Sequence, residues 1–209
     1  MGRRVLVVLT TIVLSFGILF ISITQTAQVK YSFNGHSKTD QAKVLGEKEL
    51  IEYYFPYPGR ILPDHPLWSV KAIRDKVWVL VTPKSERKAE LNLLFANKRL
   101  VSSNILFDED KPELALSVLT KAEKYLEEAL NQEEVARAKG VDTKSFLHEL
   151  AIASLKHREI IEEIMSIAPD DAKPMIAEVR EHSKKIFQSV LTSLGEVDVK
   201  APDNPFDGN

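Results

Sequence analysis

Apolar residues recur at helical spacing along the chain from residue 67 to residue 194. In each segment they return every three or four positions, with charged residues between them, which is the period of a helix with one buried face. Gly140 and Gly195 are expected to end the third and the last helix. Short connections between amphipathic helices are typical of an antiparallel bundle. The pattern predicts an all-α bundle of four to five helices over Leu67–Val81, Pro83–Phe107, Pro112–Lys139, Asp142–Ala168 and Lys173–Leu194.

The first helix is expected to begin beside Pro66, because proline has no N–H to lose in a first helical turn. Asp64 or His65 stands where an N-cap residue belongs. Residues 77–81 are rich in β-branched and aromatic side chains, which favours a strand locally. Pro83 closes the segment and no partner strand is evident, so a helix remains the prediction. Its apolar stripe consists of Val70, Ile73, Val77 and Leu80.

The N-terminus carries an uncharged apolar run, residues 5–23, preceded by Arg3 and Arg4. A helix of that length rises about 28 Å, close to the thickness of the bilayer hydrocarbon. The positive-inside rule keeps the N-terminus cytoplasmic and exports the rest. We therefore predict a transmembrane signal-anchor at residues 1–24 of a single-pass cell-membrane protein. The alternatives are a cleaved signal peptide, although Gln25 stands where a cleavage site has a small residue, and a buried core helix, although the run has no polar face.

Three further regions follow the anchor. Residues 25–56 are interpreted as a polar linker with a short helix at 47–54 and an aromatic segment at its end, residues 57–195 as the bundle domain, and residues 196–209 as a disordered tail. The aromatic segment either caps one end of the bundle or forms a ligand platform or membrane-interface belt. Trp78 lies off the apolar stripe, and either fills a groove or meets a partner. Tyr53, Tyr57 and Trp78 are therefore candidates for an interaction surface.

Composition narrows the function classes. The chain has no cysteine, which excludes disulfides, thiolate catalysis and Cys-ligated zinc. Its formal net charge of −2 argues against a nucleic-acid partner. Basic residues gather in residues 71–88, which either form a weakly basic end near anionic lipid or wall polymer or, with Asp75 and Glu86 between them, a solvated face.

No catalytic motif is evident. The chain lacks an HExxH helix, a glycine-rich phosphate loop and a GxSxG elbow, so we expect neither an enzyme nor a cofactor. His157 and His182 fall on the apolar faces of two consecutive helices, at similar heights if these helices form a hairpin near Asp170. Such a pair suits a metal or pH sensor; the alternative is two histidines bonded to Glu, Ser or water. No further ligands are evident, so no metal site is predicted.

Two motifs resemble domain-of-unknown-function family 5667. The first is Leu62-Pro63-Asp64-x-Pro66-Leu67-Trp68-x-x-Lys71, with Trp68 where Tyr or Phe is more usual, and the second includes Leu91 and Phe95. The resemblance covers about residues 57–130. It implies a small helical domain of bacteria or archaea, usually exported behind a signal or anchor, and it implies no activity and no catalytic residue.

These observations predict a non-catalytic, membrane-anchored extracytoplasmic domain. It is expected to contact the membrane through its N-terminal helix and to act through protein–protein interaction with an unidentified envelope protein. The alternative is an extracytoplasmic sensor domain that responds to a metal or to pH.

Overall fold

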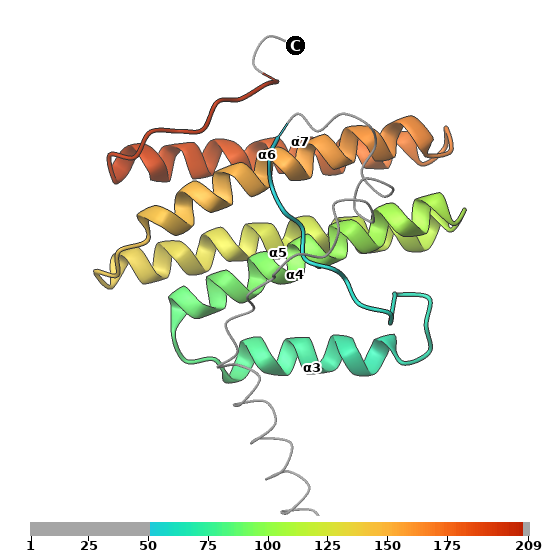
Figure 1. Cartoon of the computed structure of the whole chain (residues 1–209), viewed down its shortest axis with the longest axis horizontal. Helices are drawn as coiled ribbons and strands as arrows, with labels where there is room; N and C mark the ends of the chain where they lie inside the picture. The colour runs from blue at the N-terminus through green and yellow to red at the C-terminus, as the bar shows by residue number, and fades with distance from the viewer. Residues whose placement is uncertain (1–50, 207–209) are drawn as a thin grey trace, which may run out of the picture. The chain divides into compact units, whose positions relative to one another are not determined.

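The computed structural model describes residues 51–206, and this part of the chain contains five α-helices and no strand (Figure 1). Each predicted helix is present, with its ends moved by two residues at most. The helices are α3 (Trp68–Val81), α4 (Ser85–Asp108), α5 (Pro112–Ala138), α6 (Lys144–Ile167) and α7 (Lys173–Glu196). The all-α prediction is therefore confirmed. The predicted transmembrane helix lies outside the described residues, and no helix among the described residues is long and apolar enough to cross a membrane.

The four longer helices form the bundle, in which α4 packs against α5 and α6 against α7 as consecutive hairpins (Figure 1). The shorter α3 packs mainly on α4. Two clusters of buried apolar side chains fill the interior. One includes Leu106, Leu119 and Ile164, and the other includes Leu126, Leu150 and Val190.

Three helices end by the same hydrogen-bond pattern. After α5, Gly140 takes a positive φ of 82°, its N–H donates to the carbonyl of Arg137, and the N–H of Val141 donates to that of Ala136. This is a Schellman cap, which satisfies the last carbonyls of a helix. Asp110 after α4 and Asp198 after α7 take the same left-handed position. Gly195 therefore does not end the last helix; it lies within α7.

The segment at residues 51–58 belongs to the core. It crosses the bundle (Figure 1), and Ile51 and Phe55 are buried in the two clusters. Residues 51–54 are not helical, so the helical turn expected at 47–54 is absent from its described part; residues 47–50 lie outside the described residues. The linker interpreted to run to residue 56 thus gives way to the packed domain by residue 51.

The C-terminal residues 197–206 also pack against the bundle. Val197, Val199, Ala201 and Phe206 lie partly buried on the second apolar cluster. This differs from the disordered tail expected from composition, because a few apolar side chains spaced along an extended segment suffice to hold it on a helix surface. Residues 207–209 lie outside the described residues.

Candidate functional site

A line of polar side chains runs through the bundle interior. The hydroxyl of Tyr53 accepts a hydrogen bond from Asn97 Nδ2 at 2.8 Å. Asn97 Oδ1 lies 3.0 Å from Nε2 of His157, and Nδ1 of that histidine lies 2.7 Å from Glu123 Oε1. His157 is fully buried and Glu123 is 1 % exposed. The line thus joins the 51–58 segment to α4, α6 and α5.

Both ring nitrogens of His157 face acceptor atoms, the carboxylate of Glu123 and the amide oxygen of Asn97. A neutral imidazole carries only one N–H, so the tautomer decides which of the two contacts it makes as a donor. Glu123 Oε2 has no hydrogen-bond partner among the described residues. Burial, reinforced by Glu149, raises the pKa of Tyr53 above its ordinary value, which keeps its hydroxyl protonated.

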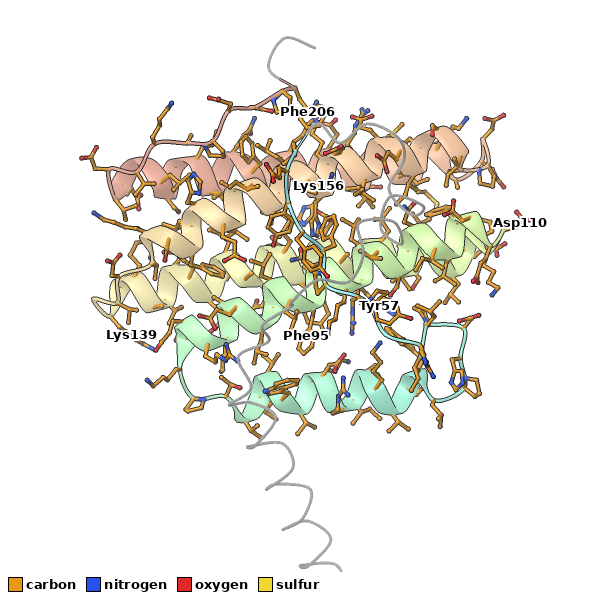
Figure 2. The ribbon with its side chains drawn as sticks, in the orientation of Figure 1. Tyr57, Phe95, Asp110, Lys139, Lys156 and Phe206 are labelled. Carbon is orange, nitrogen blue, oxygen red and sulfur yellow. The ribbon has the colours of Figure 1, made fainter. Side chains whose placement is uncertain are left out.

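A second buried ion pair, Lys156 with Glu159, lies next to His157 on α6. Lys156 is fully buried, and its Nζ lies 3.2 Å from Glu159 Oε2; Figure 2 shows Lys156 on α6 toward the middle of the bundle. Glu159 Oε2 also accepts the N–H of Ile51 at 3.2 Å. Buried charges need such partners, because an unpaired one carries a large desolvation cost. This pair therefore holds the start of the 51–58 segment on α6.

The first family motif ties α3 to the rest of the domain. Lys71 Nζ donates to the carbonyls of Pro58 at 2.7 Å and Ile61 at 3.0 Å, and lies 4.8 Å from the centre of the Trp68 ring. The guanidinium of Arg99 lies 5.4 Å from the same ring and 4.6 Å from the ring of Tyr125. These contacts are cation–π interactions, so the tryptophan and lysine of the motif have a structural role.

The pKa of the Lys71 side chain is lower than that of an ordinary lysine. Burial is the main cause that lowers its pKa to about 8; Asp75 opposes the shift, and the cations Lys98, Arg74 and Arg99 add to it. A neutral amine keeps two N–H donors, so both hydrogen bonds to the loop carbonyls survive loss of the proton.

The start of α3 differs from the expected N-cap. The helix begins at Trp68, two residues after Pro66, and no side chain caps it. His65 Nδ1 accepts the N–H of Leu67 at 3.1 Å, whereas Asp64 pairs with Lys111 at 2.7 Å. The hydrogen bond from Lys111 lowers the pKa of Asp64. Of the other motif residues, Leu62 and Pro63 are half-buried, Pro66 is exposed, and Leu91 and Phe95 are buried.

The apolar stripe of α3 faces outward, which sequence periodicity alone does not reveal. Its side chains include Leu80, 79 % exposed, and Val70 and Ile73, both above 60 %. The buried side chains of α3 are Asp75 and Trp78. We name the exposed set the α3 outer face; it comprises Leu67, Val70, Ile73, Leu80 and Val81.

Of the three residues predicted at an interaction surface, only Tyr57 is well exposed, at 66 %. Trp78 is buried, and its ring meets that of Phe95 edge to face at 6.2 Å between centroids. Tyr53 turns inward toward Asn97. Figure 2 shows Phe95 between α4 and α3, and Tyr57 away from it. Trp78 and Tyr53 are thus packing residues in this structure, a correction to their proposed exposure.

The two histidines lie in different surroundings. His157 is inside the bundle with Glu123, whereas His182 is 39 % exposed and lies 3.5 Å from Glu127. The two do not share a partner. Among the described residues, no group of three or more His, Cys, Asp or Glu side chains is placed to hold a metal ion.

Sequence reasoning did not identify Glu123, Lys156 or Arg99 as buried polar residues. The signal for Glu123 was its position among Leu119, Ala122 and Leu126 on the apolar stripe of α5. Lys156 lies between Leu155 and His157 in the same way.

Comparison with known proteins agrees with the sequence motifs. Neither the curated proteins nor the solved structures contain a significant match. The family model described as "Domain of unknown function (DUF5667)" matches residues 60–171, which is more than half of the chain and extends beyond the 57–130 resemblance into α6. The chain therefore belongs to the DUF5667 family.

Proposed function

We propose that this chain is a non-catalytic, membrane-anchored domain outside the cytoplasm, which acts by binding another protein of the cell envelope through α3. The observation that carries the proposal is the α3 outer face. Monomeric soluble domains rarely expose a contiguous apolar surface without a use for it. The buried polar groups support the non-catalytic part, because His157, Glu123 and Asn97 bond to one another and hold the 51–58 segment.

The spacing of the α3 outer face suits a protein groove. Val70, Ile73 and Leu80 lie at i, i+3 and i+10 on one side of the helix, a spacing that suits a helix bound in a hydrophobic groove. Each large apolar side chain that becomes buried contributes roughly 1.5–3 kcal/mol. Three such anchors contribute about 4.5–9 kcal/mol, which is of the size needed to offset the loss of freedom on association, about 4–15 kcal/mol.

The proposed location rests on the sequence. The apolar run at residues 5–23 and the preceding Arg3 and Arg4 support an anchor whose C-terminal side is exported. Because the chain has no native cysteine, single-cysteine variants label cleanly. In intact cells a membrane-impermeant maleimide is expected to label Lys185→Cys, an exposed position, and to leave the cysteine-free protein unlabelled. Labelling that occurs only after lysis would overturn the extracytoplasmic location.

The contact is tested by photo-crosslinking in native membranes. Ile73→Cys and Leu80→Cys, each carrying benzophenone-maleimide, are expected to give the same adduct with another membrane protein. Lys121→Cys on the exposed side of α5 is the matched control and gives none. Adducts only with lipid, only with a second copy of this chain, or equally from the α5 control, contradict the proposal.

A second function, a pH-responsive domain, is favoured by one observation. The His157–Glu123 pair is completely enclosed and reaches Tyr53 through Asn97, so a change of its protonation would bear on the segment that leads to the N-terminal residues. The test compares melting temperatures near pH 5 and near pH 8, with and without zinc, for the native chain and His157→Gln. A pH difference that the variant abolishes supports a sensor; the same profile in both proteins, unchanged by zinc, contradicts it.

A further inference from the structure

A cavity of about 310 Å³ lies between α6, α7 and the C-terminal segment. This volume is at the lower end of the range for small-molecule sites. Its lining includes the apolar side chains of Leu155, Phe187, Leu191 and Phe206 and the polar side chains of Arg158, Lys184 and Ser183. The cavity is separate from the α3 outer face and from the His157 line, so it calls for its own explanation.

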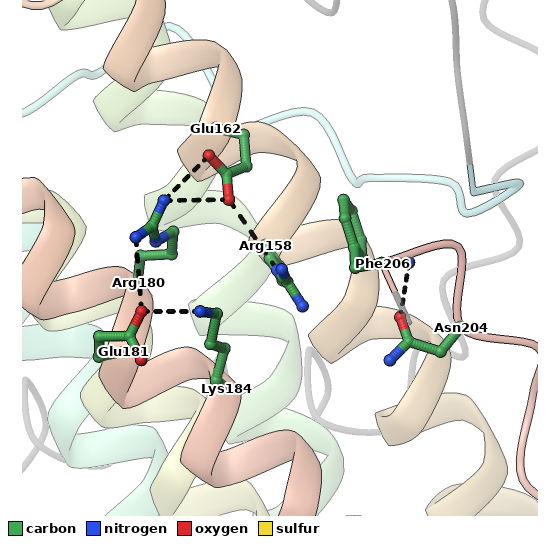
Figure 3. A network of polar contacts seen from close by, with 7 residues as sticks. All are labelled: Arg158, Glu162, Arg180, Glu181, Lys184, Asn204 and Phe206. Atoms are coloured by element: carbon green, nitrogen blue, oxygen red, sulfur yellow. Dashed lines mark hydrogen bonds and ion pairs between the residues drawn. The ribbon is translucent and has the colours of Figure 1, made fainter. Parts of the chain in front are cut away.

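The charged side chains of the cavity lining are cationic. Arg158 and Lys184 line the cavity and no carboxylate does. Figure 3 shows the network beside it, in which Glu162 pairs with Arg180 at 3.3 Å and Glu181 pairs with Lys184 at 2.8 Å. Arg158 Nε lies 3.9 Å from Glu162, beyond hydrogen-bond distance, and has no hydrogen-bond partner among the described residues. The guanidinium therefore retains donor capacity next to the cavity.

Ser183 gives a second, independent indication of a ligand. This residue is fully buried, lines the cavity, and its hydroxyl has no hydrogen-bond partner among the described residues. Ser154, across the cavity, instead donates to the carbonyl of Leu150 at 2.7 Å. Leaving a buried hydroxyl unpaired is unfavourable, because it has lost its hydrogen bonds to water. An acceptor atom bound in the cavity would remove that cost.

The C-terminal segment closes one side of the cavity. The ring of Phe206 lies over the Arg158 guanidinium, 4.2 Å from its carbon to the ring centre, as Figure 3 shows. An aromatic face covers the cation without neutralising its charge. The site thus combines two cations, a free hydroxyl and the side chains of leucine and phenylalanine.

We propose that this cavity binds a small organic anion that carries a short aliphatic chain. The anionic group, a carboxylate or a phosphate monoester, contacts Arg158, Lys184 and Ser183, and the chain lies against Phe187, Leu191 and Phe206. Charge-assisted hydrogen bonds to a guanidinium favour an anionic group. A small inorganic ion is expected to bind less tightly, because it has no chain to place against the apolar side chains.

Lysine footprinting on the full chain in lipid nanodiscs tests the proposal. An amine-acetylating reagent modifies Lys184, which lines the cavity, and its neighbour Lys185, which is exposed; mass spectrometry gives the ratio of the two rates. Hexanoate and hexyl phosphate are the probes and distinguish the two anionic groups. At least one is expected to slow Lys184 acetylation about fivefold and saturably relative to Lys185, whereas hexanol and inorganic phosphate are not.

Variants locate the effect. Arg158→Gln is expected to raise the half-protecting probe concentration about tenfold, equivalent to 1.4 kcal/mol, and Ser183→Ala about threefold or more. Lys173→Gln is the control. It lies on α7, the helix of Ser183, but away from the cavity lining, and is expected to leave the half-protecting probe concentration unchanged. Ser183→Ala removes only one atom, so it remains informative if Arg158→Gln fails to fold. Protection absent up to about 10 mM probe, equal protection by hexanol, or protection unaffected by Ser183→Ala overturns the proposal.

Discussion

His157 lies at an apolar position of a helical stripe, yet both of its ring nitrogens contact polar atoms. A buried polar side chain needs hydrogen-bond partners, because leaving it unpaired is unfavourable. The partners of His157 come from two other helices, Glu123 from α5 and Asn97 from α4. Lys156 and Glu159 form a second buried pair within α6, and Glu159 also accepts the N–H of Ile51. These side chains fix which helices meet and where the 51–58 segment crosses them.

Glu123→Leu is expected to destabilise the domain by about 3–5 kcal/mol, because it leaves a buried histidine without its carboxylate partner. The measurement is the free energy of unfolding from urea denaturation. Glu134→Leu, also on α5 and exposed, is the control and is expected to change stability by no more than about 0.5 kcal/mol. Equal effects of the two substitutions would show that the His157–Glu123 pair is not structural.

Lys71 is expected to titrate with a midpoint near 8 in the folded chain, measured from the chemical shift of its side-chain Cε, because burial lowers its pKa to about 8. In the unfolded chain the pKa of the lysine side chain has its ordinary value of 10.5. Between these two values the unfolded state binds more protons, so this group makes the free energy of unfolding rise with pH. The cost of its buried charge is fully present below the folded pKa and is gone above 10.5. A Lys71 midpoint near 10.5 would contradict this environment.

Sequence pattern identified most apolar core residues but few of the polar ones. Leu126, Leu150 and Ile164 were predicted on buried faces and are fully buried. Glu123, Lys156 and Arg99 were missed, because a single sequence shows that a charge lies on an apolar stripe but not which partner meets it. Contacts such as His157 with Asn97 join residues that lie 60 positions apart.

At the scale of elements, α3 shows where periodicity fails. An apolar stripe predicts a helix and a face, but not whether the fold covers that face. In α3 the covered side carries Trp78 and Asp75, and the apolar stripe is left outside. In this orientation Lys71 binds the loop carbonyls of Pro58 and Ile61, and Trp68 lies beside Arg99.

Substitutions on the two sides of α3 test this orientation. Trp78→Ala is expected to cost about 3–5 kcal/mol of stability, because it opens a cavity against Phe95. Leu80→Ala is expected to change stability by no more than about 0.5 kcal/mol, because its side chain is 79 % exposed. Thermal or urea unfolding measures both. A larger loss for Leu80→Ala than for Trp78→Ala would mean that α3 is turned the other way.

At the scale of the whole molecule, the number and order of helices were predictable because each has a long, regular apolar stripe. The domain boundary was not. A short irregular segment such as 51–58 carries no periodic signal, and its prolines and tyrosines are equally typical of a linker. Only the tertiary contacts of Ile51, Tyr53 and Phe55 show that it belongs to the core.

A chain that begins at residue 57, the boundary suggested by sequence, is expected to unfold at clearly lower urea concentration than one that begins at residue 47. The shorter chain lacks Phe55 and Ile51, which are 2 % and 7 % exposed, and loss of one large core side chain alone costs about 2–5 kcal/mol. Equal urea midpoints for the two chains would show that the segment contributes nothing to the domain.

The most direct test of the account is the size of the native complex when the α3 outer face is removed. The triple variant Val70→Ala, Ile73→Ala, Leu80→Ala keeps good helix formers at exposed positions, so its melting temperature is expected to match that of the native chain. Native gel electrophoresis of mildly solubilised membranes is expected to show the native chain in a complex with another protein and the variant released from it. A complex of unchanged size and amount in a normally folded variant would contradict the proposal that α3 binds the partner.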